Sequence, residues 1–396
     1  MTGDIPAILG GNPAFPERIP ITSPTLPTFA QVSADLRTVL ESGQLTNGPW
    51  VEALEQAILK RIAGTYAVAM ASCTSGLLLT LRSLRIRGEV VLPSFTFSAT
   101  GHALLWNDLK PAFVDIDPET LQIDPEHAEA AINRKTGAIL GVHMYGSPCN
   151  VDALQEIATD HKIPLIFDAA HALGARVNGR SVGTFGTAEV FSLSPTKLVV
   201  AVEGGVVTTG NEELARFLRA GRNYGDSGDY DPLFPGLSAR MGEWNAVLAK
   251  HTLDCLDANM KARATLAGLY MKRLSVHPGI RFQKALPTTV STWKDFSIFL
   301  DRKQAPLSRD ELYRALEREN VVCRRYFSPP LHLMKIWSGK SKGKLPNTER
   351  ASREVLSLPM YSHMPLEVAT RICDVIDVLF SRNREVKAAL EKVFIS

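Results

Sequence analysis

The sequence predicts an α/β fold in two domains: a large domain whose sheet is covered by helices on both faces, and a smaller C-terminal α/β domain. The chain has 396 residues, more than one ordinary domain holds. Over residues 66–209, short and nearly continuous apolar runs alternate with helical patterns, which is typical of a sheet buried on both faces. After residue 240 this alternation ends. One long helical pattern follows, and then shorter strands and helices.

The first elements precede the alternating region. Residues 1–27 are rich in Pro and Gly and predict an extended arm. Residues 28–42 predict an amphipathic helix, and residues 44–49 form a turn cluster. Residues 51–64 have apolar positions at helical spacing and end at a glycine, as helices often do.

Strands and helices then alternate in the manner of βαβ units. Expected strands lie at residues 66–72, 89–93 and 110–117, at the beginnings of 137–146 and 164–175, and in the later runs AEVFSL and GGVVTT. Expected helices cover residues 75–84, 98–107 and 151–162.

The C-terminal part begins with a helical pattern over residues 241–274, which we expect to form one long connecting helix. Residues 296–300 predict a strand and residues 309–320 a helix. The boundary between the domains should fall within or just after the connecting helix. We therefore expect an arm (1–27), a large domain (28–255) and a small domain (256–396).

Composition excludes several classes of function. The net charge of +3 comes from 44 basic and 41 acidic residues without blocks of like charge, so nothing indicates nucleic-acid or membrane binding. The five cysteines are widely spaced and include no CxxC pair, so we expect neither a disulfide framework nor a metal site. The first residues lack the pattern of a signal peptide, and no run of about 18 apolar residues occurs. We expect a cytoplasmic protein.

Two charged residues stand where a charge is costly. Asp168 ends an apolar run, and a carboxylate at the end of a buried strand needs a partner, although it could instead cap the next helix. Lys197 is followed by apolar residues, so desolvation should lower the pKa of its amine. An imine-forming lysine needs such a pKa, although a lysine that extends along a loop into water would fit the same pattern.

Three further segments could complete a ligand site. SCTSG (72–76) joins a strand to a helix, and its hydroxyls and amides suit a phosphate, unless they only cap the helix. PSFTF (93–97) offers an aromatic ring that could cover a flat ligand or pack in the core. His171 could contact the same ligand or serve as a structural histidine. No GxxxxGK[ST] occurs and no GxGxxG follows the first strand, so a nucleotide-cofactor dehydrogenase has no support.

Taken together, these features meet the requirements of a pyridoxal phosphate (PLP) site. Such a site needs a lysine that forms an imine with the aldehyde and a carboxylate that faces the pyridine nitrogen. It also needs amides at a helix N-terminus for the phosphate and an aromatic or apolar cover for the ring. The candidates all follow strands of the first domain, where open α/β sheets bind ligands.

A series of segments spans nearly the whole chain and occurs in this order: TNGPWVEALE, ASCTSG, VLPSFTFSATG, FVDIDPETLQID, VHMYGSP, IFDAAHALGA, VGTFGTAEVFSLSPTK, EGGVVTT, GRNYG, PGLSARMGEWNA, YFSPPLH and LPNTERASREVLSLPMY. In these segments the chain resembles the DegT/DnrJ/EryC1/StrS aminotransferases, also called the sugar aminotransferases. The resemblance implies a fold type I PLP-dependent enzyme with a mostly parallel seven-stranded sheet, and a homodimer with both active sites at its interface.

The same resemblance implies a role for each matching residue. Lys197 takes the imine position and Asp168 the position at the pyridine nitrogen. Ser238 replaces an asparagine that reaches the cofactor phosphate of the neighbouring subunit; because serine is shorter, this contact could be lost or bridged by water. The remaining implied contacts are His171 beside the ring hydroxyl, Phe97 on the ring face, Cys73, Thr74 and Ser192 at the phosphate, and Tyr326 and His332 at the substrate.

The implied activity is transfer of an amino group from an amino acid, L-glutamate in most of the family, to a keto group of a nucleotide-linked deoxysugar. This reaction belongs to amino-sugar biosynthesis, including that of antibiotics. A keto-cyclitol acceptor, a PLP-binding regulatory protein and an inactive scaffold are the alternatives. Dehydratase members of the family replace the lysine with histidine, so Lys197 argues against that reaction.

Overall fold

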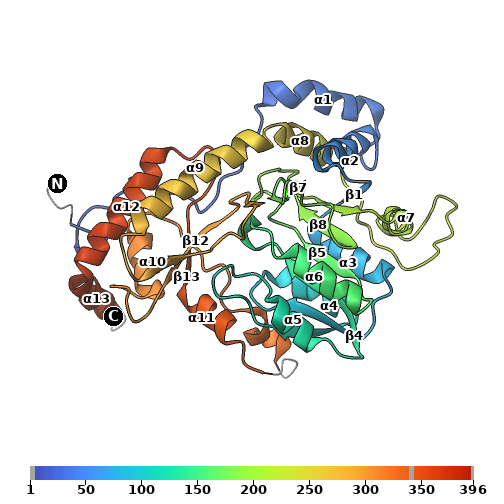
Figure 1. Ribbon diagram of the computed structural model, residues 1–396. Coiled ribbons are helices and arrows are strands. Elements are labelled where there is room, and N and C mark those ends of the chain that lie inside the picture. Colours follow the sequence, from blue (N-terminus) through green and yellow to red (C-terminus); the bar gives the residue numbers. More distant parts are fainter. Residues whose placement is uncertain (1–4, 339–342, 394–396) are drawn as a thin grey trace.

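The large domain is built on a seven-stranded sheet with the strand order β1-β9-β8-β5-β4-β2-β3 (Figure 1). This computed structural model describes residues 5–338 and 343–393. Strand β9 runs antiparallel to both of its neighbours, and the remaining neighbours are parallel, which confirms the expected sheet. The strands are β1 (Tyr66–Met70), β2 (Glu89–Pro93), β3 (Lys110–Val114), β4 (Thr136–Val142), β5 (Leu165–Asp168), β8 (Ala188–Ser192) and β9 (Gly205–Thr209).

Alternate residues of these strands face two separate cores, as the period of a strand requires. In β1, Ala67 and Ala69 belong to one core, whereas Val68 and Met70 belong to the other. Helices therefore cover both faces, as the sequence predicts. The first core includes α2 (Pro49–Ile62), α5 (Pro125–Ala131), α6 (Val151–Asp160) and α8 (Glu243–Asp254), and the second includes α3 (Cys73–Ser83), α4 (Ser98–Leu105) and α7 (Glu212–Gly221). Helix α1 (Phe29–Ser42) packs outside α8.

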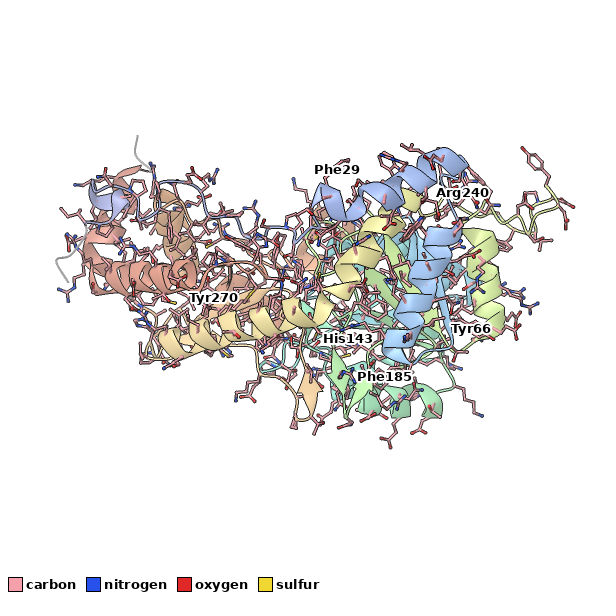
Figure 2. All side chains as sticks on the ribbon, turned by 90° about the horizontal axis from the view of Figure 1, so that it is seen from above. Phe29, Tyr66, His143, Phe185, Arg240 and Tyr270 are labelled. Atoms are coloured by element: carbon pink, nitrogen blue, oxygen red, sulfur yellow. The ribbon has the colours of Figure 1, made fainter. Side chains whose placement is uncertain are left out.

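The C-terminal part has its own core and its own three-stranded sheet, in the order β10-β12-β13. Figure 2 shows Tyr270, a residue of α9 that belongs to this core, well away from Phe185 of the large domain. No helix in the described ranges is long and apolar enough to cross a membrane. The elements are α9 (Leu256–Leu274), β10 (Ile280–Phe282), β12 (Phe296–Leu300), α10 (Arg309–Arg318), α11 (Pro346–Glu354), β13 (Val355–Leu358), α12 (Leu366–Ser381) and α13 (Asn383–Val393), and a small sheet joins β11 (Thr289–Val290) to β6 (Arg176–Val177) and β7 (Arg180–Ser181).

The long helix expected over residues 241–274 is interrupted at Cys255, where α8 ends and α9 begins. Leu253 of α8 packs in the core of the large domain, whereas Leu266 and Tyr270 of α9 pack in the C-terminal core. The interruption lets the chain change direction between the two cores. We propose this position, between residues 255 and 256, as the domain boundary.

The N-terminal arm lies along the C-terminal part, although it precedes the large domain in sequence (Figure 1). It is mostly extended, with one short 3-10 turn at Ala7–Leu9. Phe15 enters the C-terminal core, and the backbone of Ile19 pairs with Asn320 and Val322. The C-terminal core is thus assembled from both ends of the chain.

Candidate active site

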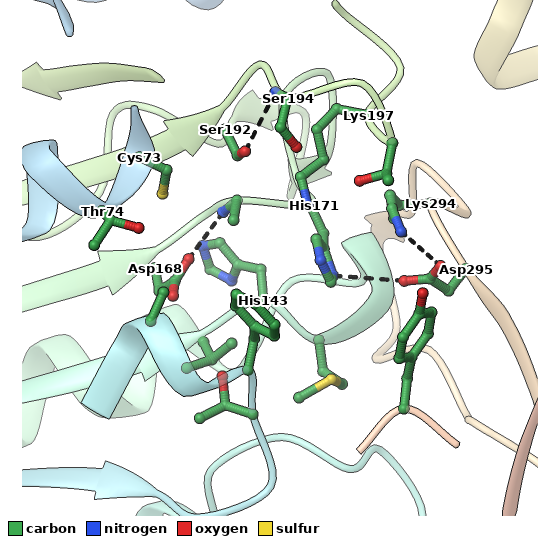
Figure 3. A pocket seen from close by; sticks show the side chains of 18 of the residues that line it. Cys73, Thr74, His143, Asp168, His171, Ser192, Ser194, Lys197, Lys294 and Asp295 are labelled. Atoms are coloured by element: carbon green, nitrogen blue, oxygen red, sulfur yellow. Dashed lines mark hydrogen bonds and ion pairs between the residues drawn. The ribbon is translucent and has the colours of Figure 1, made fainter. Parts of the chain in front are cut away.

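A cavity of about 360 Å³ opens at the carboxyl ends of β4, β5 and β8, where an open α/β sheet is expected to bind ligands (Figure 3). Segments from the C-terminal part close its other side. The cavity brings together eight of the residues that the sequence singled out: Lys197, Asp168, His171, Phe97, Cys73, Thr74, Ser192 and Tyr326.

Asp168 is the last residue of β5 and is only 6% exposed. Thr100 donates to its Oδ2 at 2.7 Å, and the backbone N–H of Ala170 donates to its Oδ1 at 3.1 Å. Because the Thr100 hydrogen points to Asp168, Thr96 must donate to Thr100 at 2.9 Å. Burial raises the pKa of Asp168, while these hydrogen bonds and the charge of Lys197 favour its ionised form. The carboxylate is therefore held in one orientation at the edge of the cavity.

Lys197 follows β8 on a loop whose next residues, Leu198 and Val199, are buried. Burial lowers the pKa of its amine to about 8, and the positive charge of Lys294 acts in the same direction. A lysine with this pKa is partly neutral near pH 7 and so can attack a carbonyl group.

Helix α3 directs its N-terminus at the same cavity. Its N-cap is Ser72, whose side chain accepts the N–H of Ser75 at 3.1 Å. The N–H groups of Cys73 and Thr74 have no hydrogen-bond partner within the part of the chain that the structure describes. Free N–H groups and the helix dipole together make an anion site. Ser192, at the end of β8, lines the cavity with them.

The start of β9 packs directly on this helix terminus. A Cβ atom at Gly205 would lie 2.5 Å from the nitrogen of Cys73 and 2.6 Å from the carbonyl carbon of Ser72. Only glycine permits this approach of two backbones. The paired glycines that follow Glu203 thus set the position of the anion site.

The remaining predicted residues of the cavity lie around its mouth and floor. Phe97, at the start of α4, is 58% exposed, and its ring lies 6.1 Å from that of Phe327. Burial and two lysine charges lower the pKa of His171 well below its usual value, so its imidazole is neutral. Burial raises the pKa of the Cys73 thiol, which argues against a reactive thiolate.

Two predicted residues do not line the cavity. Ser238 is exposed and forms a bridge with Asn223 on the loop after α7. His332 is buried elsewhere: Ser94 Oγ accepts its backbone N–H at 2.9 Å and contacts its Nδ1 at 2.6 Å, and its Nε2 faces Glu349 at 3.7 Å. The position of His332 therefore gives no support to the predicted substrate contact.

Among the cavity residues that were not singled out from the sequence, three ionisable ones stand out. His143 follows β4, stacks on Phe167 and pairs with buried Glu189 at 3.2 Å. Its place at a strand end beside Asp168 is a signal that could have identified it. Lys294 and Asp295 come from the C-terminal part, and no local pattern marks them as cavity residues.

The donor set fits PLP. One amine of lowered pKa, one buried carboxylate, one helix N-terminus with free N–H groups and one aromatic ring converge on one cavity. The volume lies within the range of ligand pockets. Lys197 would hold the aldehyde, Asp168 the pyridine nitrogen, and Cys73, Thr74 and Ser192 the phosphate.

Comparison with known proteins agrees with this site. The model of the DegT/DnrJ/EryC1/StrS aminotransferase family matches residues 29–377. A curated relative, the dTDP-4-amino-4,6-dideoxy-D-glucose transaminase of Escherichia coli, is 32% identical over 359 residues, which cover 89% of this chain and 96% of that protein.

Solved structures share the fold over almost the whole chain. The crystal structure of DesI in the presence of its TDP-sugar product has a TM-score of 0.92 and 34% identity, and the match covers 97% of this chain and 98% of that one. The Streptococcus pneumoniae protein Spr1654, solved in a PLP form, shares the fold with a TM-score of 0.86 and 21% identity, covering 92% of this chain and 99% of that one. The cofactor is PLP, and the chain belongs to the DegT/DnrJ/EryC1/StrS aminotransferase family.

Proposed function

We propose that this aminotransferase moves an amino group from L-glutamate to a keto group of a nucleotide-linked deoxysugar, in amino-sugar biosynthesis. The observation that carries the proposal is the convergence of Lys197, Asp168 and the N-terminus of α3 on one cavity. The acceptor class is supported by the relatives, because one is named for a dTDP-linked amino sugar and another was solved with a TDP-sugar product.

Each of the named residues has a separate role in the proposed reaction. PLP, when bound, supplies the aldehyde that carries the amino group and a ring that withdraws electrons from the reacting carbon. Lys197 anchors the aldehyde and, once its Nζ is free, takes the proton from the donor's α-carbon and returns a proton in the reverse half-reaction. Asp168 keeps the pyridine nitrogen protonated, and Thr100 holds Asp168 in place at 2.7 Å.

The test is to follow the two half-reactions separately by absorbance. L-glutamate should convert the bound aldehyde form to the amine form in a single turnover, and a nucleotide-linked keto sugar should convert it back. Failure of every amino acid donor would exclude a transaminase. Reversal by an inosose but by no nucleotide keto sugar would replace the proposed acceptor with a keto-cyclitol.

We further propose a homodimer with shared active sites. The loop after α7 projects from the large domain and exposes Tyr230 (96%) and Leu233 (72%), and Ser238 lies on the same loop (Figure 1). An exposed apolar loop of this kind suits a protein interface. Light scattering that gives the mass of a single chain at working concentration would exclude this assembly.

A further inference from the structure

Lys294 and Asp295 form a buried ion pair in the wall of the cavity. They lie between β11 and β12 and are only 5% and 6% exposed. Lys294 Nζ is 2.7 Å from Asp295 Oδ1. In Figure 3, Thr74, Cys73 and Asp168 lie on one side of His171 and Lys197, and the ion pair lies on the other. The groups that fit PLP occupy the first side, so the ion pair faces the space that remains for the substrate.

One atom of the pair is left without a partner. Asp295 Oδ2 is buried and accepts no hydrogen bond within the described ranges. The nearest polar atom recorded for it, Nδ1 of His171, is 3.9 Å away, too far for a hydrogen bond. A buried carboxylate oxygen without a donor is costly, which indicates that a ligand supplies one.

The neighbouring cationic side chains do not donate a hydrogen bond to Asp295 Oδ2. Arg263 comes close enough for Asp295 to favour its charged form, but its hydrogen bonds go to the backbone carbonyls of Trp293, Lys294 and Met360 and to Ser362. Lys294 uses one donor on Asp295, and its Nζ stands 5.6 Å from the ring centroid of Tyr326. The pair therefore presents a free acceptor and two further N–H donors beside an aromatic ring.

We propose that Lys294 and Asp295 recognise hydroxyl groups on the ring of the keto substrate. Oδ2 of Asp295 accepts a hydrogen bond from one hydroxyl, and Nζ of Lys294 donates to a neighbouring one. The inference rests on the proposed function, because it assigns the acceptor side of the same cavity. Since the pair has no net charge, it suits a neutral polyol better than the carboxylates of an amino acid donor.

The test distinguishes binding of the sugar part of the substrate from binding of its nucleoside diphosphate part. Calorimetry measures how the protein loaded with the amine form of the cofactor, which cannot react with an amino sugar, binds a nucleotide-linked amino sugar and the corresponding nucleoside diphosphate alone. Asp295→Asn and Lys294→Met should each weaken binding of the amino sugar nucleotide about tenfold or more, since each removes a charged hydrogen-bond partner. Binding of the nucleoside diphosphate alone should not change.

A matched control is the exposed pair Lys284–Glu119, joined at 2.6 Å outside the cavity. Lys284→Met should leave the affinity for the amino sugar nucleotide as it is in the wild type. Melting temperature and PLP content establish that each variant is folded; Asp295→Asn keeps the shape of the side chain, and Lys294→Met is an independent second variant.

The half-reactions provide a second readout. In the variants, reversal by the keto sugar should need a higher substrate concentration, and this loss should exceed any change in the conversion by L-glutamate measured at each variant's pH optimum. Equal losses in both half-reactions, or unchanged binding of the amino sugar nucleotide, would overturn the assignment.

Failure of the proposed function gives a different result. If the wild type binds no nucleotide sugar but binds an inosose more tightly than the variants do, the hydroxyl site holds and the proposed acceptor is wrong. If the wild type binds neither compound, both proposals are wrong.

Discussion

Lys197 combines a cavity position with an amine pKa of about 8. The apolar residues after Lys197 predicted a lowered pKa but also fitted a lysine that extends into water, and the family resemblance decided between the two. The resemblance likewise decided for Asp168, which could instead have capped a helix. Lys294 and Asp295 were not predictable, because their burial depends on segments that lie far from them in sequence and only the folded chain brings together. Ser238 and His332 lie outside the cavity lining of this chain. The contact expected of Ser238 is to the cofactor of the neighbouring subunit and stays a prediction, as does the substrate contact of His332.

Replacement of Lys197 should remove the covalent link to the cofactor. In Lys197→Ala we expect no borohydride-stable PLP adduct and a loss of turnover of at least about 10²–10⁴-fold, the usual contribution of a general acid–base group. Mass spectrometry of the reduced protein measures the adduct. A stoichiometric adduct in this variant would show that another lysine is the anchor.

Replacement of Asp168 should slow the amino-transfer reaction more than it weakens the binding of PLP. Asp168→Asn keeps the size of the side chain but cannot hold a proton on the pyridine nitrogen, so we expect PLP to bind while the glutamate half-reaction slows about 10²–10³-fold, as when other preorganised electrostatic groups are removed. Stopped-flow absorbance measures this rate. A wild-type rate would contradict the assignment.

The pH dependence of loading follows from the charge of Lys294. In the apoprotein, Lys197 reacts with PLP only when its amine is neutral, so the rate of loading should rise as pH increases through about 8. Lys294→Met removes a positive neighbour, and the midpoint should move to higher pH. Loading rates measured from pH 6 to 10 check this, with Lys284→Met as control. A midpoint that stays in place or falls would show that Lys294 does not act on Lys197.

At the scale of elements, periodicity predicted the seven strands of the main sheet and the helices α1 to α4 and α6, but not α5, α7 or the short strands β6 and β7. The interruption at Cys255 was not predictable, because neither Gly nor Pro marks it and each half continues the same helical pattern. On either side of it, Leu253 of α8 packs in the core of the large domain and Leu266 of α9 in the C-terminal core. The contact of β9 with α3 has no signal in the sequence beyond the pair of glycines at residues 204 and 205.

That contact yields a prediction at the same scale. Gly205→Ala should push β9 away from the N-terminus of α3, because its Cβ would lie 2.5 Å from the backbone nitrogen of Cys73. We expect a loss of about 1–3 kcal/mol in stability and weaker PLP binding. The matched control is Gly210→Ala. A Cβ added at Gly210, five residues after Gly205, would have no atom within 4 Å. Thermal melting and PLP titration that show no difference between the two variants would refute the account.

At the scale of the whole molecule, one buried carboxylate holds the first part of the arm, ahead of the contacts made by Phe15 and Ile19. Glu319 is 3% exposed and accepts the N–H groups of Ala7 and Ala14, each at 2.7 Å. The sequence predicted an extended arm but could not identify its partner, because the two segments lie some three hundred positions apart.

Glu319→Ala should therefore release residues 7–14 of the arm, since each buried N–H left unpaired would cost about 1–3 kcal/mol. Limited proteolysis should cut near residue 14 in this variant first. Glu317→Ala, which alters an exposed residue in the last turn of α10, two positions before Glu319, should behave like the wild type. Resistance of the arm in both variants would mean that Glu319 does not hold it.

The docking of the arm also determines when the chain can finish folding during synthesis. The arm is synthesised long before its partner, because Ala7 bonds to a residue 312 positions later in the sequence. At about 5–20 residues per second, that interval is roughly 15–60 s. The large domain, which is continuous in sequence, can fold in that time, whereas the C-terminal core is completed only when it binds a segment that was made long before it.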